Sequence, residues 1–109
     1  MMLQQFKAEL FKALSHPVRI RVLELLRDQE RTVTDLQACL QIEHSTVSQQ
    51  LMVLRSRNIL DARKEGTSVY YSVRDPRVFD LLDTARILFN NHLASLQNMV
   101  PSDERATGP

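Results

Sequence analysis

The feature that most constrains the fold of this chain is a pair of short helical patterns joined by about four residues. Apolar residues recur at helical spacing in residues 35–40 and again in residues 44–57. We expect His44 or Ser45 to cap the second helix. We expect Asn58 to end it, because asparagine tolerates left-handed backbone. The inward faces are given by Leu36, Leu40, Val47, Leu51 and Leu54. Two helices with so short a connection are typical of a helix-turn-helix.

A strand pair is predicted directly after these helices. Residues 59–64 and 68–73 flank a short polar turn that contains Gly66, and the second segment alternates with a period of two. We expect the tip of this hairpin to carry Arg63, Lys64 and Thr67. Because a hairpin that follows a helix-turn-helix is a wing, the predicted fold is mainly α with a small β-hairpin, a winged helix-turn-helix of about five helices.

Two further helical patterns precede the pair. Residues 3–14 have one apolar stripe, whereas residues 18–27 are apolar nearly all round, which predicts that this second helix lies at the centre of the core. Ser15 or His16 can cap the second helix, and Pro17 suits its first turn, where a missing N–H has no cost.

The last helix is expected to begin at Asp75 and Pro76 and to run to about Met99. Its apolar positions follow a heptad-like spacing of four and three residues. Left unpaired, this seam and the stripe of the first helix would expose too much apolar surface, so we expect a dimer through the first and last helices. The predicted interface residues are Leu3, Phe6, Leu10, Val78, Leu82, Ala85, Phe89, His92 and Leu96.

Length and composition favour one domain, residues 1–100, followed by a flexible tail at residues 101–109. No apolar run is long enough to span a bilayer, and we expect no signal peptide and a cytoplasmic location. The single cysteine excludes an intrachain disulfide. Without a glycine-rich phosphate loop, a nucleophile elbow or a supported carboxylate pair, we expect no enzymatic activity.

Positive charge is concentrated in residues 44–74, where five cationic residues against two anionic ones give +3, whereas the whole chain carries +1. A basic segment in a nearly neutral protein suggests a surface for a polyanion, although a solvated charged face is the alternative.

The outward stripe of residues 44–57 carries hydroxyl and amide groups instead of the usual Glu and Lys. Glutamine can pair with adenine through two hydrogen bonds, and a helix in the major groove contacts bases mainly through its N-terminal half. The predicted DNA-binding residues are Ser45, Thr46, Ser48, Gln49, Gln50, Arg55, Arg57, Arg63, Lys64 and Thr67. The alternatives are a polar surface helix, or a winged module that binds another protein.

Three runs resemble the ArsR/SmtB-type family of bacterial repressors. Residues 11–23 are similar to the start of that family, residues 45–55 to its recognition helix, and residues 63–73, with Gly66 and the Tyr70-Tyr71 pair, to its wing. The resemblance covers roughly residues 6–96. It implies a homodimer that binds a palindromic operator in double-stranded DNA and is released by an inducer.

The chain departs from the family pattern at the positions that bind DNA and metal. Gln50 stands where the family often has His, and Asn58 where it often has Gly. Thr32 and Thr34 stand where the family's thiolate site has cysteines, and threonine is a poor ligand for soft metals.

The second metal site of the family lies in its last helix. Its ligand set is incomplete in this chain around Asp80 and His92. We therefore expect no metal site and no cofactor.

Cys39 and the three histidines have structural and functional interpretations. We expect Cys39 to be a buried small hydrophobe, with a redox or metal-binding thiol as the alternative. His16 is expected to start a helix, and His44 to cap one or to contact phosphate. His92 is expected at the dimer interface, with a pH-dependent or metal-linked role as the alternative.

Overall fold

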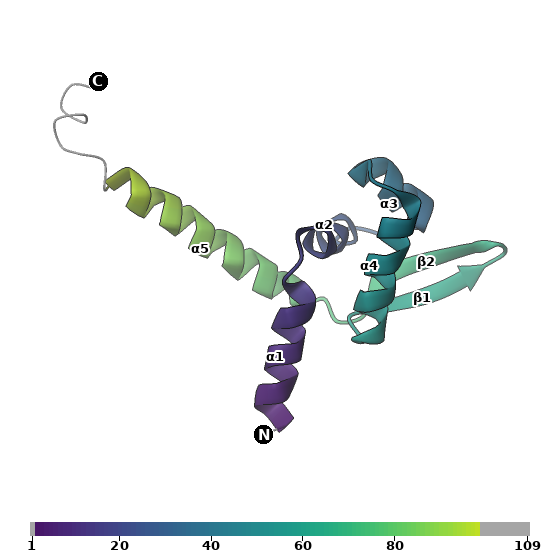
Figure 1. Cartoon of the computed structure of the whole chain (residues 1–109), viewed down its shortest axis with the longest axis horizontal. Helices are drawn as coiled ribbons and strands as arrows, with labels where there is room; N and C mark the ends of the chain where they lie inside the picture. Colours follow the sequence, from purple (N-terminus) through teal and green to yellow (C-terminus); the bar gives the residue numbers. More distant parts are fainter. Residues whose placement is uncertain (1, 99–109) are drawn as a thin grey trace. The chain divides into compact units, whose positions relative to one another are not determined.

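The computed structural model describes residues 2–98 (Figure 1). In chain order the elements are α1 (Met2–Leu14), α2 (Pro17–Leu25), α3 (Val33–Leu40), α4 (His44–Ser56), β1 (Leu60–Glu65), β2 (Ser68–Val73) and α5 (Val78–Asn98). The chain divides into two compact units after Pro76. The predicted domain boundary at residue 100, the tail and Met99 lie outside the described residues.

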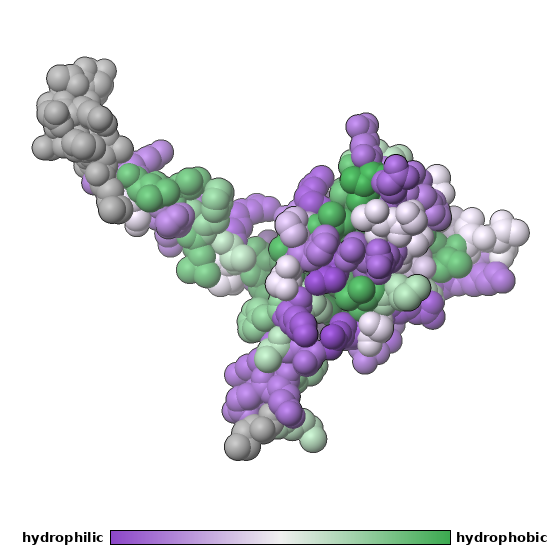
Figure 2. All heavy atoms as spheres, in the orientation of Figure 1, coloured by the Kyte–Doolittle hydropathy of each residue, from purple (hydrophilic) through white to green (hydrophobic). Residues whose placement is uncertain are grey.

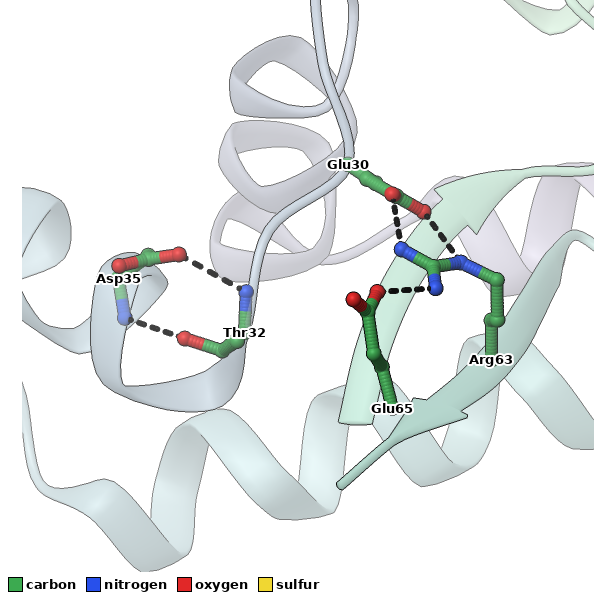
Figure 3. Close-up of polar contacts among 5 residues, drawn as sticks. All are labelled: Glu30, Thr32, Asp35, Arg63 and Glu65. Atoms are coloured by element: carbon green, nitrogen blue, oxygen red, sulfur yellow. Dashed lines mark hydrogen bonds and ion pairs between the residues drawn. The ribbon is translucent and has the colours of Figure 1, made fainter. Parts of the chain in front are cut away.

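The starts of α2 and α3 are determined by local capping. His16 has extended backbone and accepts a hydrogen bond at Nδ1 from the Val18 N–H, 3.1 Å away, with Pro17 in the first turn. Thr32 Oγ1 accepts from the Asp35 N–H, and the Asp35 carboxylate accepts from the Thr32 N–H, both at 3.1 Å (Figure 3). This reciprocal pair is a capping box, which occupies two N–H groups that the helix itself leaves unpaired.

Helix α4 begins one residue earlier than a cap at His44 or Ser45 would require, so that prediction is wrong. Glu43 is the N-cap residue, and its carbonyl oxygen accepts from the Val47 N–H at 3.1 Å, while its side chain makes no capping hydrogen bond. At the other end Asn58 has φ 62°, which confirms that asparagine ends this helix with left-handed backbone.

The core of the first unit lies among α2, α3, α4 and β1. Helix α4 packs against α2, α3 and β1, and α1 packs against α2. The buried side chains are Ala13, Leu14, Val22, Leu23, Leu26, Leu36, Val47, Leu51, Leu54, Ile59 and Leu60. Val22 and Leu23 are fully enclosed, which confirms the central place predicted for α2.

The wing is an antiparallel pair in which Leu60 lies opposite Val73 and Glu65 opposite Ser68. Gly66 turns the chain with φ 62°, a conformation that glycine adopts without steric cost. Of the three residues expected at the tip, Thr67 lies in the turn, whereas Arg63 and Lys64 lie within β1. Strand β1 begins and ends one residue later than the predicted segment 59–64, which already contained Arg63 and Lys64.

Strand β2 has a partner on each edge. Besides β1 it pairs with Arg31, whose N–H donates to the Tyr71 carbonyl at 3.1 Å and whose carbonyl accepts from the Tyr71 N–H at 2.8 Å. All six residues of β2 are half-buried, so the alternation in its sequence does not appear as alternation in burial.

Helix α5, the described part of the second unit, begins at Val78, because Pro76 and Arg77 form a turn. The predicted start at Asp75 and Pro76 is therefore wrong by two to three residues. Val78 and Phe79 are buried, and every residue from 84 to 98 is exposed. Across residues 2–98, no helix combines the length and the apolar character needed to cross a membrane.

Candidate nucleic-acid interface

The outward face of α4 is polar at its start and apolar at one position further on. Packing of Val47, Leu51 and Leu54 into the core turns Ser45 and Gln49 outward, and both are exposed. Thr46, Ser48 and Gln50 flank this stripe and are half-buried. Met52 continues the stripe and is 70% exposed.

A groove of about 490 Å³ runs between α4 and the wing. Its lining combines hydroxyl groups, one cation and an exposed thioether, contributed by Ser48, Leu51, Met52, Arg55, Ser56 and Tyr71. Hydroxyl and guanidinium groups of this kind can donate to phosphate oxygens.

Among the described residues, no side chain caps the N-terminus of α4. The N-cap side chain makes no capping hydrogen bond, and the carbonyl of Glu43 is the acceptor for both the Thr46 and the Val47 N–H groups. The first N–H groups of a helix carry partial positive charge and favour phosphate. The polar stripe therefore begins where the helix itself attracts an anion.

The structure divides the predicted phosphate-binding cations into two classes. Arg57 pairs with Glu9 of α1, and Arg63 pairs with Glu30 and Glu65. Within residues 2–98, the side chains of Arg55 and Lys64 form no hydrogen bond or ion pair, and both are exposed. Of these four predicted cations, Arg55 and Lys64 are thus the two that remain available to a phosphate.

Arg63 has the most constrained side chain of the wing (Figure 3). Its Nε and one terminal nitrogen bind the two carboxylate oxygens of Glu30, and its other terminal nitrogen lies 2.5 Å from Glu65. These bonds, first to Glu30 and then to Glu65, raise the pKa of Arg63. The guanidinium also lies over the ring of Tyr70, 5.0 Å from its centroid.

Gln50 faces a neighbouring helix. Its Oε1 accepts from an Nη of Arg19 in α2 at 3.2 Å, and the Nε of Arg19 donates to the Ala13 carbonyl at 2.7 Å. Sequence reasoning placed Gln50 among the DNA-binding residues and missed Arg19. The available signal was that Gln50 lies next to Leu51 and between the inward positions Val47 and Leu54.

Cys39 is exposed, so the expectation of a buried cysteine is wrong. The inward face of α3 is formed by Val33, Leu36, Gln37 and Leu40, and Cys39 lies about 100° around the helix from Leu40. His16 caps α2 as predicted, and His44 and His92 are exposed. Among residues 2–98, no group of three or more His, Cys, Asp or Glu side chains is arranged to hold a metal ion.

All of the predicted interface residues of α1 and α5 except Val78 are exposed or half-buried in the single chain. On α1, Leu3 and Phe6 are 58% and 64% exposed, and Leu10 is half-buried. On α5, Phe89 and Leu96 are 59% and 47% exposed. Ala85 and His92 are also exposed, Leu82 is half-buried and Val78 is buried. Figure 2 shows the apolar side chains gathered along α5.

Comparison with known proteins identifies relatives of this architecture. Residues 14–63 match the family model described as a helix-turn-helix domain. The HTH-type transcriptional regulator Rv0081 of Mycobacterium tuberculosis is 45% identical over 85 residues, which span 77% of this chain and 75% of that protein. The Synechocystis transcriptional repressor SmtB homolog is 43% identical over 77 residues, 71% of this chain and 58% of that protein.

Solved structures agree with the fold. The crystal structure of Rv0081 has a TM-score of 0.77 at 41% identity and covers 85% of this chain and 94% of its own. The homodimeric winged helix-turn-helix DNA-binding domain of Mb0332 from Mycobacterium bovis, a possible ArsR-family regulator, has a TM-score of 0.75 at 30% identity. That match covers 84% of this chain and 85% of the Mb0332 domain.

Rv0081 and the SmtB homolog are named as a transcriptional regulator and a transcriptional repressor, and the Mb0332 domain is named as a DNA-binding domain. Five helices, a two-stranded wing and the sequence identity to SmtB-type repressors agree with one another. The chain belongs to the ArsR/SmtB family of winged helix-turn-helix transcriptional regulators.

Proposed function

We propose that this regulator is a homodimeric repressor that inserts α4 into the major groove of a palindromic operator. The observation that carries the proposal is the exposed Ser45 and Gln49 stripe at the start of α4, where no side chain caps the helix. Amide and hydroxyl groups at that end of a helix suit base edges, and the helix terminus suits the adjacent phosphate.

The available side chains suggest a division of roles. Gln49 and Ser45 would contact base edges, with Thr46 and Ser48 beside them. Arg55 lies in the groove between α4 and the wing, and together with Lys64 and Thr67 it would contact phosphate or the minor groove. Arg57, Arg63 and Gln50, which bind other side chains of the protein, would contribute indirectly.

The second copy of the chain is the proposed cover for the apolar faces of α1 and α5. Exposed phenylalanine and leucine side chains along both helices support this assignment, since a monomer rarely leaves so much apolar surface in water. A two-fold dimer would present two α4 helices to half-sites about one helical turn apart. Light scattering should give twice the chain mass at micromolar concentration, and a monomer that binds its operator tightly would contradict the assignment.

The protein would act in the cytoplasm as a repressor of its target genes. We further propose that an inducer releases it from DNA. Thr32 caps α3 and is therefore used structurally where a thiolate ligand would stand in the metal-sensing pattern. The inducer would accordingly act through another site.

The proposed division of roles is tested with two variants on two DNAs. Gln49→Ala should weaken operator binding by about 1–3 kcal/mol and affect random duplex little, because it removes a base contact. Lys64→Ala should weaken both about equally and lower the slope of log affinity against log salt by about one unit.

A loss on random DNA as large as the loss on the operator would remove Gln49 from the base contacts. A wild-type protein that shows no salt-dependent binding to any duplex would favour the alternative, a winged module that binds another protein.

A further inference from the structure

We propose that Arg63 is a positioning residue that fastens the wing to the loop before α3, and that its guanidinium does not itself bind phosphate. The inference rests on the proposed function in one respect, since the consequence for DNA requires the wing to contact DNA. The fastening itself rests on the contacts of the wing.

The first observation is that the guanidinium of Arg63 already donates to two carboxylates through all three of its nitrogens. Glu30 takes the Nε side in a two-point contact, and Glu65 takes the opposite terminal nitrogen at 2.5 Å (Figure 3). A planar guanidinium matches a carboxylate through two parallel N–H bonds, and such pairs are geometrically specific. A phosphate would therefore approach a guanidinium that two carboxylates already hold.

The second observation is the place of Glu30 in the chain. Its neighbour Arg31 exchanges two backbone hydrogen bonds with Tyr71 of β2, and the Arg31 Nε donates to the Leu25 carbonyl at the end of α2, 2.6 Å away. The loop is thus attached to α2 on one side and to β2 on the other.

The third observation is that Arg63 reaches this loop from the far strand. Tyr71 pairs with Ala62 of β1 on one edge and with Arg31 on the other, so β2 lies between β1 and the loop. The Arg63 side chain crosses over the ring of Tyr70 to reach Glu30. A single side chain therefore spans the wing from its outer strand to the helix-turn-helix.

The need for this link follows from the size of the sheet. A two-stranded hairpin is marginally stable by itself, so its orientation depends on what holds it. Single exposed ion pairs contribute little, but a two-point pair within a network of charges is the exception. Lys64, the next residue on β1, points to the opposite face of the strand and stays available to DNA.

The test compares two charge-neutralising variants in the full-length protein. Glu30→Gln and Glu65→Gln each remove one negative charge near Arg63, but of these two carboxylates only Glu30 lies in the loop, whereas Glu65 lies in β1 itself. We expect Glu30→Gln to weaken operator binding about three- to fivefold, and Glu65→Gln to leave it unchanged or strengthen it. If Glu30 merely restrained a phosphate-binding arginine, Glu30→Gln would strengthen binding, which would overturn the proposal.

Two variants of Arg63 sharpen the test. Arg63→Lys keeps the charge but loses the two-point pair, so we expect it to weaken binding as Glu30→Gln does. Arg63→Gln should lower affinity while the salt slope stays at its wild-type value. A fall of the slope by about 0.9, as expected for Lys64→Ala, would make Arg63 a phosphate contact and refute the proposal.

A measurement without DNA separates this proposal from the proposed function. Amide hydrogen exchange at the Tyr71 N–H, which binds the Arg31 carbonyl, should accelerate in Glu30→Gln and Arg63→Lys but not in Glu65→Gln. Equal exchange in all three would refute the fastening role even if the protein binds its operator as proposed.

Discussion

Replacing Arg19 should reveal how α4 is held in place. Arg19 is half-buried and donates to three acceptors: the Ala13 carbonyl at 2.7 Å, the Gln50 Oε1 at 3.2 Å and the Lys12 carbonyl at 3.4 Å. The first and third acceptors are at the C-terminal end of α1, where orphan carbonyls favour a cation. One guanidinium therefore joins the end of α1 to the recognition helix.

The magnitude follows from the geometry of these bonds. A hydrogen bond from a charged donor contributes a net of roughly 1.5–3 kcal/mol, but the partial exposure of Arg19 and the 3.4 Å length of one bond reduce that value. We expect Arg19→Met, which keeps the apolar stem, to cost about 2 kcal/mol and Gln50→Ala about 1 kcal/mol. The double variant should lose about 0.5–1 kcal/mol less stability than the sum of the losses in the two single variants.

Urea unfolding of the four proteins measures this cycle. All four must be compared at one protein concentration, because the stability of a dimer depends on it. Gln49→Ala is the matched control, since Gln49 is the adjacent glutamine and is exposed. The control should change the free energy of unfolding by less than about 0.5 kcal/mol.

Two results would refute this account. Strict additivity of Arg19→Met and Gln50→Ala would mean that the 3.2 Å contact contributes nothing to stability in solution. A Gln50→Ala variant of unchanged stability that loses operator affinity but not affinity for random duplex would show that Gln50 contacts bases, as the sequence analysis predicted.

Three further outcomes are expected. Thr32→Ala should lower the free energy of unfolding by about 1 kcal/mol through loss of the capping box, and Thr32→Ser should recover most of it. Leu36→Ala, at a fully enclosed position, should lower the free energy of unfolding in urea by about 2–5 kcal/mol. Its control, Cys39→Ala on the exposed side of α3, should lower it by less than about 0.5 kcal/mol. Zinc, cadmium and arsenite under reducing conditions should leave the operator complex intact in a mobility-shift titration. Stoichiometric release that survives both Cys39→Ser and His92→Ala would contradict this expectation.

Helix positions and most helix ends were predictable because their causes are local. Within residues 2–98 apolar spacing identified the five helices, the His16 side chain caps α2, and Asn58 has the expected left-handed backbone. The errors concern the first residues of two helices. Helix α4 begins at a residue whose side chain makes no capping hydrogen bond, and α5 begins only after the turn at Pro76.

Which charged and polar side chains are available to DNA was not predictable. Arg57 and Glu9 are 48 residues apart in sequence, Arg63 and Glu30 are 33 apart, and Arg19 and Gln50 are 31 apart. No spacing rule connects such pairs, because they meet only after the helices and the wing have packed.

The sequence by itself determined the order of elements, the outward stripe of α4 and the apolar faces of α1 and α5, since periodicity acts within one helix or strand. Only the tertiary structure decided that Arg57 and Arg63 form ion pairs within the protein while Arg55 and Lys64 stay unpaired among residues 2–98. The physical reason is that the net positive charge of residues 44–74 predicts attraction to a polyanion but does not say which cations provide it. Packing brings carboxylates close to some of these cations and not to others, and only the unpaired cations keep their full attraction for a polyanion.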